Sequence, residues 1–211
     1  PSGHPLTVIV NNFSNCLYMR YAYYVLHEHN EHVPPFDSVI KLMCYGDDNA
    51  MGVSSEEPYF NHTAVSQILG EVGIKYTMAD KEAESIPFIP FEQVTFLKRA
   101  FRYDEEMENW IAPIEVASIS KSLHNYMTRK GSVVLPEQIA ADAIVNANEE
   151  FWRHGPEVFG QRRPQLQKVA EEAGLLMYTG ELPDHYELKE RYFGRKMRKS
   201  IFDEPSTAHF D

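Results

Sequence analysis

The 211-residue chain carries a net charge of −11, with 43% hydrophobic and 24% charged residues. Such a composition is typical of one sizeable globular domain or two small ones. The charge counts against a protein that binds nucleic acid over its whole surface, because affinity for phosphates comes mainly from Lys and Arg. No run approaches the roughly 18–20 apolar residues of a membrane-spanning helix. We therefore expect an intracellular, soluble chain without a membrane segment.

A long amphipathic helix is predicted over residues 7–29, where apolar side chains recur at helical spacing. These side chains are Val10, Phe13, Leu17, Tyr21 and Tyr24. Pro34 and Pro35 follow and stop the helix. Three histidines near its end have the composition of a metal site, namely His27, His29 and His32. Residues two apart point about 200° apart around a helix axis, so we expect these rings to be solvated instead.

A hairpin is predicted next. The apolar run 39–45 is typical of a buried strand, and residues 50–53 form a returning strand. Gly46, Asp47 and Asp48 then lie at the tip. The two cysteines, Cys16 and Cys44, lie inside apolar segments. Their spacing suits neither a disulfide framework nor a zinc site, so we expect small core residues.

The segment after the hairpin predicts a second helix, capped by Asn61 or Thr63 and ended by Gly73. Short strands are expected at residues 74–78 and 94–101, where apolar and polar residues alternate. The first half of the chain therefore has an α+β pattern.

Beyond residue 113 the periodicity is helical, with segments expected at 114–129, 136–153 and 155–174. We expect residues 179–211 to be an extended tail with a short helix around 186–199. Trp110 and Trp152 are interpreted as core anchors, because tryptophan in such contexts packs more often than it stacks on bases.

Adjacent carboxylates at a tight turn, here Asp47 and Asp48, are suited to binding a hard divalent cation such as Mg²⁺. Two such ions about 3.5–4 Å apart can activate a 3′-hydroxyl and stabilise leaving pyrophosphate. Gly-Asp turns are nevertheless common hairpin connectors. Alone, this tip is better explained as a turn.

Four segments in one order change that interpretation. They are Pro1-Ser2-Gly3 with Thr7 and Asn11, then Tyr45-Gly46-Asp47-Asp48, then Ala79-Asp80-Lys81, and finally Phe96-Leu97-Lys98-Arg99. Together they resemble motifs B, C, D and E of picornavirus-like viral RNA-dependent RNA polymerases. A chance match in this order is a poor explanation.

The resemblance implies a role for each matching residue. Asp47 would be the principal metal ligand, with Asp48 assisting and Mn²⁺ as an alternative to Mg²⁺. Lys81 would be the general acid toward pyrophosphate. The remaining residues would contact nucleotide or RNA: Ser2, Gly3, Thr7 and Asn11 at the nucleotide, with Asn11 sensing the ribose 2′-hydroxyl, and Lys98 and Arg99 at primer phosphates.

The resemblance also implies a domain layout, an α+β fold that continues into helices. Residues 1–103 would be a partial palm, residues 104–178 a helical thumb, and residues 179–211 a tail of unknown role. The motif-A strand with its own aspartate, and the fingers, would belong to an amino-terminal polymerase region outside this chain. The expected partners are therefore that region, template and primer RNA, and nucleoside triphosphates. The expected location is the replication complex in the host cytoplasm.

Two alternatives remain open. A reverse transcriptase shares the palm layout, although the Ser-Gly loop with Asn11 favours RNA synthesis. A non-catalytic binding module would require the order of the four segments to be coincidence. Metal binding at Asp47 separates an enzyme from such a module.

Overall fold

A computed structural model describes residues 4, 6–125 and 133–202, with side chains as far as Gly194. The chain divides into two compact units, Pro1–Phe101 and Arg102–Asp211. The described residues contain helices and short antiparallel strand pairs, which confirms the predicted α+β class. No helix among them is long and apolar enough to cross a membrane.

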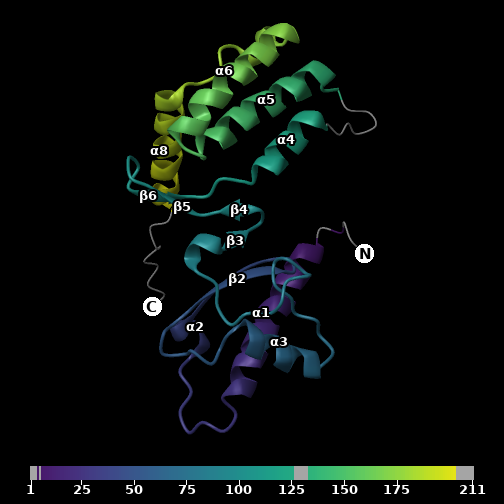
Figure 1. The fold of residues 1–211 in the computed structure, drawn as a ribbon, viewed down its shortest axis with the longest axis vertical. Coiled ribbons are helices and arrows are strands. Elements are labelled where there is room, and N and C mark those ends of the chain that lie inside the picture. The colour runs from purple at the N-terminus through teal and green to yellow at the C-terminus, as the bar shows by residue number, and fades with distance from the viewer. Residues whose placement is uncertain (1–3, 5, 126–132, 203–211) are drawn as a thin grey trace, which may run out of the picture. The chain divides into compact units, whose positions relative to one another are not determined.

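The first unit consists of a long helix, a hairpin and a second helix (Figure 1). Its elements are α1 (Leu6–Leu26), α2 (Phe36–Val39), β1 (Ile40–Tyr45), β2 (Asp48–Val53), α3 (His62–Glu71), the 3-10 turn Phe91–Gln93, β3 (Thr95–Phe96) and β4 (Arg99–Ala100). The predicted long helix is confirmed, although it ends at Leu26 rather than His29. Because α1 contains neither Gly nor Pro, nothing in its interior breaks it.

Apolar side chains from α1, the hairpin and α3 form the core of this unit. They are Met19, Ala22, Tyr23, Phe36, Val39, Ile40, Phe60, Val65 and Leu69. Tyr23 lies at the centre, in edge contact with Phe36 and Phe60 at centroid distances of 5.4 and 5.5 Å. This core fixes α1 beneath the hairpin.

The prediction that all three histidines are solvated is wrong for His27, which is only 8% exposed. Its Nε2 lies 2.9 Å from a carboxylate oxygen of buried Glu57, and its Nδ1 lies 2.8 Å from the carbonyl oxygen of Tyr23. Both ring nitrogens face acceptors, so the His27–Glu57 pair must hold a proton between its two members. His29 and His32 are exposed, as predicted.

The second helix has the predicted cap, because Asn61 accepts a hydrogen bond from the backbone N–H of Ala64 at 3.1 Å. It also has the predicted end, since Gly73 has a φ of 80°. Residues 74–78, however, are not a strand. A strand exists only through pairing with a neighbour, and β2 pairs with β1 alone among the described elements.

The second unit is mainly helical and opens with a hairpin that the sequence interpretation missed. Its elements are β5 (Arg102–Asp104), β6 (Asn109–Ile111), α4 (Val116–His124), α5 (Pro136–Trp152), α6 (Pro156–Glu172), α7 (Leu176–Thr179) and α8 (His185–Phe202). The predicted helices therefore exist, with α4 shorter than residues 114–129. Residues 126–132 lie outside the described part of the chain.

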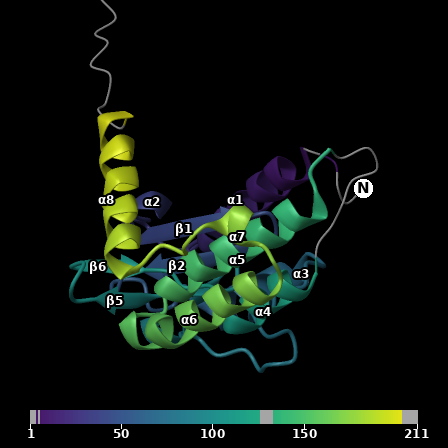
Figure 2. The ribbon, with the colours of Figure 1, turned by 90° about the horizontal axis from the view of Figure 1, so that it is seen from above.

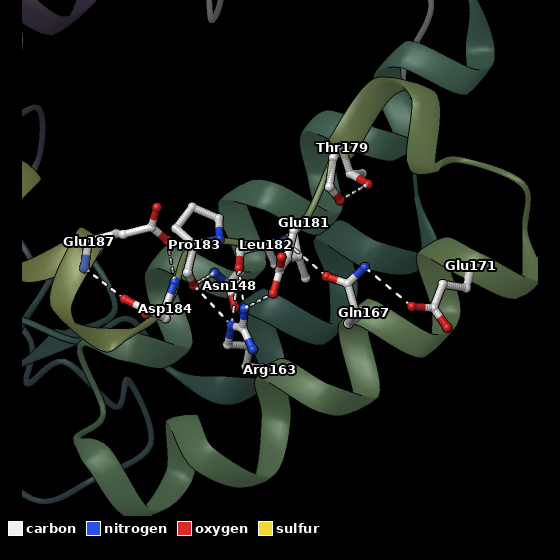
Figure 3. Close-up of polar contacts among 11 residues, drawn as sticks. Asn148, Arg163, Gln167, Glu171, Thr179, Glu181, Leu182, Pro183, Asp184 and Glu187 are labelled. Carbon is white, nitrogen blue, oxygen red and sulfur yellow. Dashed lines mark hydrogen bonds and ion pairs between the residues drawn. The ribbon is translucent and has the colours of Figure 1, made fainter.

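Residues 180–184 form a strap that joins α7 to α8, and polar side chains of α5 and α6 hold this strap (Figure 3). Arg163 donates to the carbonyl oxygen of Leu182 at 2.6 Å, and Gln167 accepts from the Leu182 N–H at 2.9 Å. Asn148, fully buried, donates to the carbonyl oxygen of Pro183 at 3.1 Å. These bonds satisfy strap backbone groups that the core would otherwise leave unpaired.

The short helix expected around residues 186–199 is confirmed as α8, which spans His185–Phe202, so the segment expected to be an extended tail is largely helical among its described residues. Figure 2 shows α8 running away from the β5–β6 hairpin. Leu188 packs with buried Trp152 and Phe159, so the expectation of a core position is confirmed for Trp152. It is wrong for Trp110, which is 49% exposed and in edge contact with Tyr103.

A polar cluster attaches the start of α8 to the β5–β6 hairpin. Trp152 Nε1 donates to His185 Nδ1 at 3.1 Å, and His185 Nε2 lies 3.1 Å from a carboxylate oxygen of Glu106. The Lys189 ammonium lies 2.6 Å from the other oxygen of Glu106. Contact with Lys189 and then with His185 lowers the pKa of the Glu106 carboxyl below its ordinary 4.5.

We expect Glu106→Gln to lower the stability of the chain at neutral pH but not at acid pH. A carboxyl whose pKa is lowered by folding stabilises the native state above its unfolded pKa, and this contribution disappears as pH falls through the lower folded pKa. Melting temperatures of wild type and Glu106→Gln should differ at neutral pH, approach each other as pH falls below the unfolded pKa of about 4.5, and coincide below the lower folded pKa. Glu190→Gln, at an exposed position of the same helix, should show no such convergence. Parallel pH profiles for wild type and Glu106→Gln would contradict the prediction.

Candidate active site

The tip of the β1–β2 hairpin is a two-residue turn. Tyr45 pairs with Asp48, which leaves Gly46 and Asp47 as the connecting residues. Gly46 has a φ of 67°, as the first position of a type II′ hairpin turn requires. Asp47 therefore lies in the turn and Asp48 is the first residue of β2. Both side chains are exposed.

The turn is held by the middle of α1. Asn15 donates from its side-chain amide to the carbonyl oxygen of Asp47 at 3.0 Å. Asn12 accepts a hydrogen bond from the backbone N–H of Gly46. The sequence interpretation missed both asparagines. No sequence pattern marks either asparagine, because α1 also carries other polar residues such as Asn11 and Ser14.

The two carboxylates themselves make no hydrogen bond or ion pair to any described residue. The protein thus fixes the backbone of the turn and leaves the carboxylates of Asp47 and Asp48 available to a ligand. The described residues contain no group of three or more potential metal ligands. Two carboxylate side chains fit part of a Mg²⁺ site, because this ion prefers oxygen ligands and keeps several waters.

Two of the residues predicted to select the nucleotide, Thr7 and Asn11, lie on α1. Asn11 lies one helical turn before Asn15, so the two share a face of α1. Thr7 lies one further turn away on the same face, and both Thr7 and Asn11 are partly exposed. Ser2 and Gly3 lie outside the described residues.

Lys81 lies in an exposed turn after residues 74–78. The side chain of Asp80 accepts a hydrogen bond from the backbone N–H of Glu82, and its carbonyl accepts one from the backbone N–H of Ala83, both at 3.1 Å. These bonds order the backbone on either side of Lys81. No described contact joins Lys81 to Asp47 or Asp48.

Lys98 and Arg99 lie on the hairpin formed by β3 and β4. The turn residues Leu97 and Lys98 have φ values of 52° and 62°. Two consecutive positive φ angles define a type I′ hairpin, which ordinarily takes Asn or Gly. A non-glycine residue in this backbone conformation costs free energy, and such residues cluster at functional sites. Lys98 is exposed and Arg99 partly buried.

Two cysteines lie close together near the turn, one on α1 and one on β1. The sulfur atoms of Cys16 and Cys44 lie 3.9 Å apart, and both residues are partly exposed rather than fully buried. Burial, followed by the hydrogen bond to Cys16, raises the pKa of the Cys44 thiol to about 12. Cys44 is therefore a protonated packing residue at neutral pH, since the thiolate is the nucleophilic form.

Comparison with known sequences identifies relatives over nearly the whole chain. The family described as viral RNA-dependent RNA polymerase matches residues 1–170. The RNA1 polyprotein of Red clover mottle virus is 34% identical over 206 residues, which cover 94% of this chain and 10% of the polyprotein. The RNA1 polyprotein of Cowpea mosaic virus (strain SB) is also 34% identical, over 91% of this chain and 10% of the relative.

A further relative is less similar in sequence. The replicase polyprotein of Drosophila C virus (strain EB) is 28% identical over 195 residues, which cover 87% of this chain and 11% of the polyprotein. The chain thus spans about a tenth of the length of the curated relatives it matches.

Proposed function

This chain belongs to the picornavirus-like viral RNA-dependent RNA polymerase family, and from that membership we propose that it is part of an enzyme that copies RNA from an RNA template during viral genome replication. The family match includes the segment with the Gly46–Asp47 turn. The substrates would be nucleoside triphosphates, with template and primer RNA as partners. Replication would take place in the host cytoplasm.

The exposed, unpaired carboxylates on a fixed turn are the observation that carries this proposal. Asp47 and Asp48 would hold Mg²⁺, or Mn²⁺ in its place, together with ligands from outside the described residues. A bound divalent ion supplies charge stabilisation to the attacking and leaving oxygens of nucleotidyl transfer. The contribution of this chain is to hold the two carboxylates in place, because the backbone of the turn is bonded to Asn12 and Asn15.

Recognition of the nucleotide would fall to the face of α1 that carries Thr7, Asn11 and Asn15. Asn11 has a side-chain amide that can donate to or accept from the ribose 2′-hydroxyl, the group that distinguishes RNA from DNA. Thr7 would support the ribose pocket. Ser2 and Gly3 would follow template and nucleotide during translocation.

The β3–β4 hairpin would support the primer end. Lys98 lies in its two-residue turn and Arg99 begins the second strand, so the two cations are adjacent at one end of the hairpin. Arg engages phosphate oxygens bidentately, whereas Lys provides a point charge. In this proposal residues 1–103 are part of the palm, residues 104–178 are the thumb, and residues 179–211 have no assigned role.

An amino-terminal polymerase region would complete the enzyme, and two features of the first unit support this. A pocket of about 210 Å³ lies between β2 and residues 76–79, which overlap the strand expected at residues 74–78. A motif-A strand that covers this pocket would add a third carboxylate. Furthermore, α1 exposes apolar side chains away from the core, and a large exposed apolar patch is normally covered by another part of a protein. The exposed side chains include Leu6, Ile9, Val10, Phe13, Leu17 and Tyr24.

We expect the purified 211-residue chain to show no RNA synthesis, because two carboxylates leave the metal site incomplete. Primer extension on an RNA template, with Mg²⁺ and with Mn²⁺, measures this directly. The complete polymerase containing this segment should extend the primer with ribonucleotides and should discriminate against deoxyribonucleotides. Extension by the isolated chain would contradict the expectation. A complete polymerase that extends only with deoxyribonucleotides would overturn the proposed function.

A further inference from the structure

The contact between Asn15 and the Asp47 carbonyl is the last link of a longer chain of hydrogen bonds. Asn15 Oδ1 accepts from Asn49 Nδ2 at 2.8 Å. Asn49 Oδ1 in turn accepts from the Tyr76 hydroxyl at 2.8 Å. The chain therefore runs from residue 76 through β2 and α1 to the turn.

The last acceptor in this series of hydrogen bonds, the backbone carbonyl of Asp47, determines which group donates at every step. A backbone carbonyl can only accept, so Asn15 must present its amide nitrogen to Asp47 and its oxygen to Asn49. Asn49 must then present its nitrogen to Asn15 and its oxygen to Tyr76. Tyr76 must donate, and burial raises the pKa of Tyr76, so its hydroxyl keeps the proton that it donates.

Tyr76 is itself anchored to α3. Its ring stacks on His62 at a centroid distance of 4.9 Å, and its carbonyl accepts from the Ser66 hydroxyl at 3.0 Å. The chain thus connects three elements, α3, β2 and α1, to the carbonyl of one residue. Asn15, only 6% exposed, is shielded from competing water.

We propose that Tyr76 and Asn49 are positioning residues for the metal-binding turn, acting through Asn15 on the peptide that joins Asp47 to Asp48. This inference deepens the proposed function and rests on it. The orientation of that peptide sets the direction in which both carboxylates leave the backbone. Mg²⁺ requires near-octahedral coordination at about 2.0–2.1 Å, so a small rotation of the peptide misplaces its ligands.

The same series of hydrogen bonds links the Gly46–Asp47 turn to the segment that carries Lys81. Tyr76 lies five positions before Lys81 and belongs to the lining of the pocket beside β2. A shift of residues 76–79 would therefore reach Asp47 through hydrogen bonds. Positioning by rigid supporting residues is how catalytic groups are held to within a fraction of an ångström.

The test uses the complete polymerase containing this segment, with Tyr76→Phe as the central variant. The substitution removes one hydroxyl and keeps the ring that stacks on His62. Tyr23→Phe is the matched control, because it removes the Tyr23 hydrogen bond to the Pro34 carbonyl at 3.0 Å within the same unit. The readouts are Mn²⁺ binding by electron paramagnetic resonance, hydrogen exchange over residues 44–49, and melting temperature.

We expect Tyr76→Phe to weaken Mn²⁺ binding by about three- to tenfold, the factor that corresponds to one hydrogen bond. Exchange over residues 44–49 should accelerate in Tyr76→Phe and remain unchanged in Tyr23→Phe. Asn49→Ser should have a similar effect. The double variant should bind Mn²⁺ no more weakly than either single variant, because each substitution interrupts the same series of hydrogen bonds.

Several results would overturn the inference. In the first, Mn²⁺ binding and exchange are unchanged in Tyr76→Phe. In the second, Tyr23→Phe alters them equally, which would indicate general loss of stability. Failure of Tyr76→Phe to fold, when Tyr23→Phe folds, would assign the bond to stability alone. If instead Asp47→Asn does not alter Mn²⁺ binding, the proposed function itself fails.

Discussion

Asp47→Ala should lower RNA synthesis by the complete polymerase about 10³-fold or more, because a catalytic metal ion contributes several kcal/mol to transition-state stabilisation. Asp48→Ala should be milder, on the order of tenfold. The difference follows from the hairpin. The backbone N–H of Gly46 and the carbonyl of Asp47 are bonded to α1, so Asp47 lies between two anchored backbone groups, whereas Asp48 is the first residue of β2 and pairs with Tyr45. We therefore rank Asp47 as the principal ligand.

The measurement is primer extension at saturating nucleotide over a range of Mg²⁺ concentrations. Asp37→Ala is a suitable control, because it removes an exposed carboxylate of the same unit whose pair with Arg20 lies at the surface. Surface pairs contribute little to stability. Equal residual activities of Asp47→Ala and Asp48→Ala would show that the two ligands have been ranked wrongly.

Neither substitution should unfold the protein. The carboxylates of Asp47 and Asp48 make no hydrogen bond or ion pair with the described residues, and both side chains are exposed. Exposed substitutions of this kind change stability by about 0.5 kcal/mol or less. A loss of activity with an unchanged melting temperature would therefore report on chemistry.

Local patterns predicted the elements that position the site. The apolar spacing of α1, the buried run before Gly46 and the cap at Asn61 are signals contained within a few residues of each other. They depend on backbone geometry and short-range hydrogen bonds, which vary little with context. The hairpin that carries Asp47 was accordingly predicted with nearly correct bounds.

Features that depend on distant partners were not predicted. His27 is buried because Glu57, 30 positions later, faces it. Residues 74–78 have the alternation of a strand, but none of the described residues supplies a neighbour for pairing. The β5–β6 hairpin consists of three-residue strands, which are too short for periodicity to reveal.

The candidate site shows the same division. Asp47 and Asp48 are recognisable by residue type and motif. Asn12, Asn15 and Asn49 are not, because asparagine in a helix or strand has no distinctive pattern. Their importance follows only from the hydrogen bonds that converge on the turn.

Lys81 is exposed and makes no described contact with Asp47 or Asp48. A general acid needs to approach the leaving oxygen only during the reaction, and catalytic hydrogen bonds often form only in the complex with substrate. The turn of residues 79–83 is held at its backbone by Asp80, which leaves the ammonium of Lys81 at the surface. Movement of this exposed turn toward bound nucleotide would bring the ammonium to pyrophosphate.

If Lys81 donates that proton, its effect should be confined to the chemical step. We expect Lys81→Leu to lower the single-turnover rate by about 10²–10⁴, the usual range for general acid catalysis, and to flatten its pH dependence. Nucleotide affinity should change much less. Lys81→Arg should reduce the rate less or shift its pH profile, because it keeps a cation with a much higher pKa. Lys75→Leu, at another exposed position of the same segment, should leave the rate unchanged. A Lys81→Leu polymerase with the wild-type rate, or with weakened nucleotide binding alone, would identify Lys81 as a surface lysine.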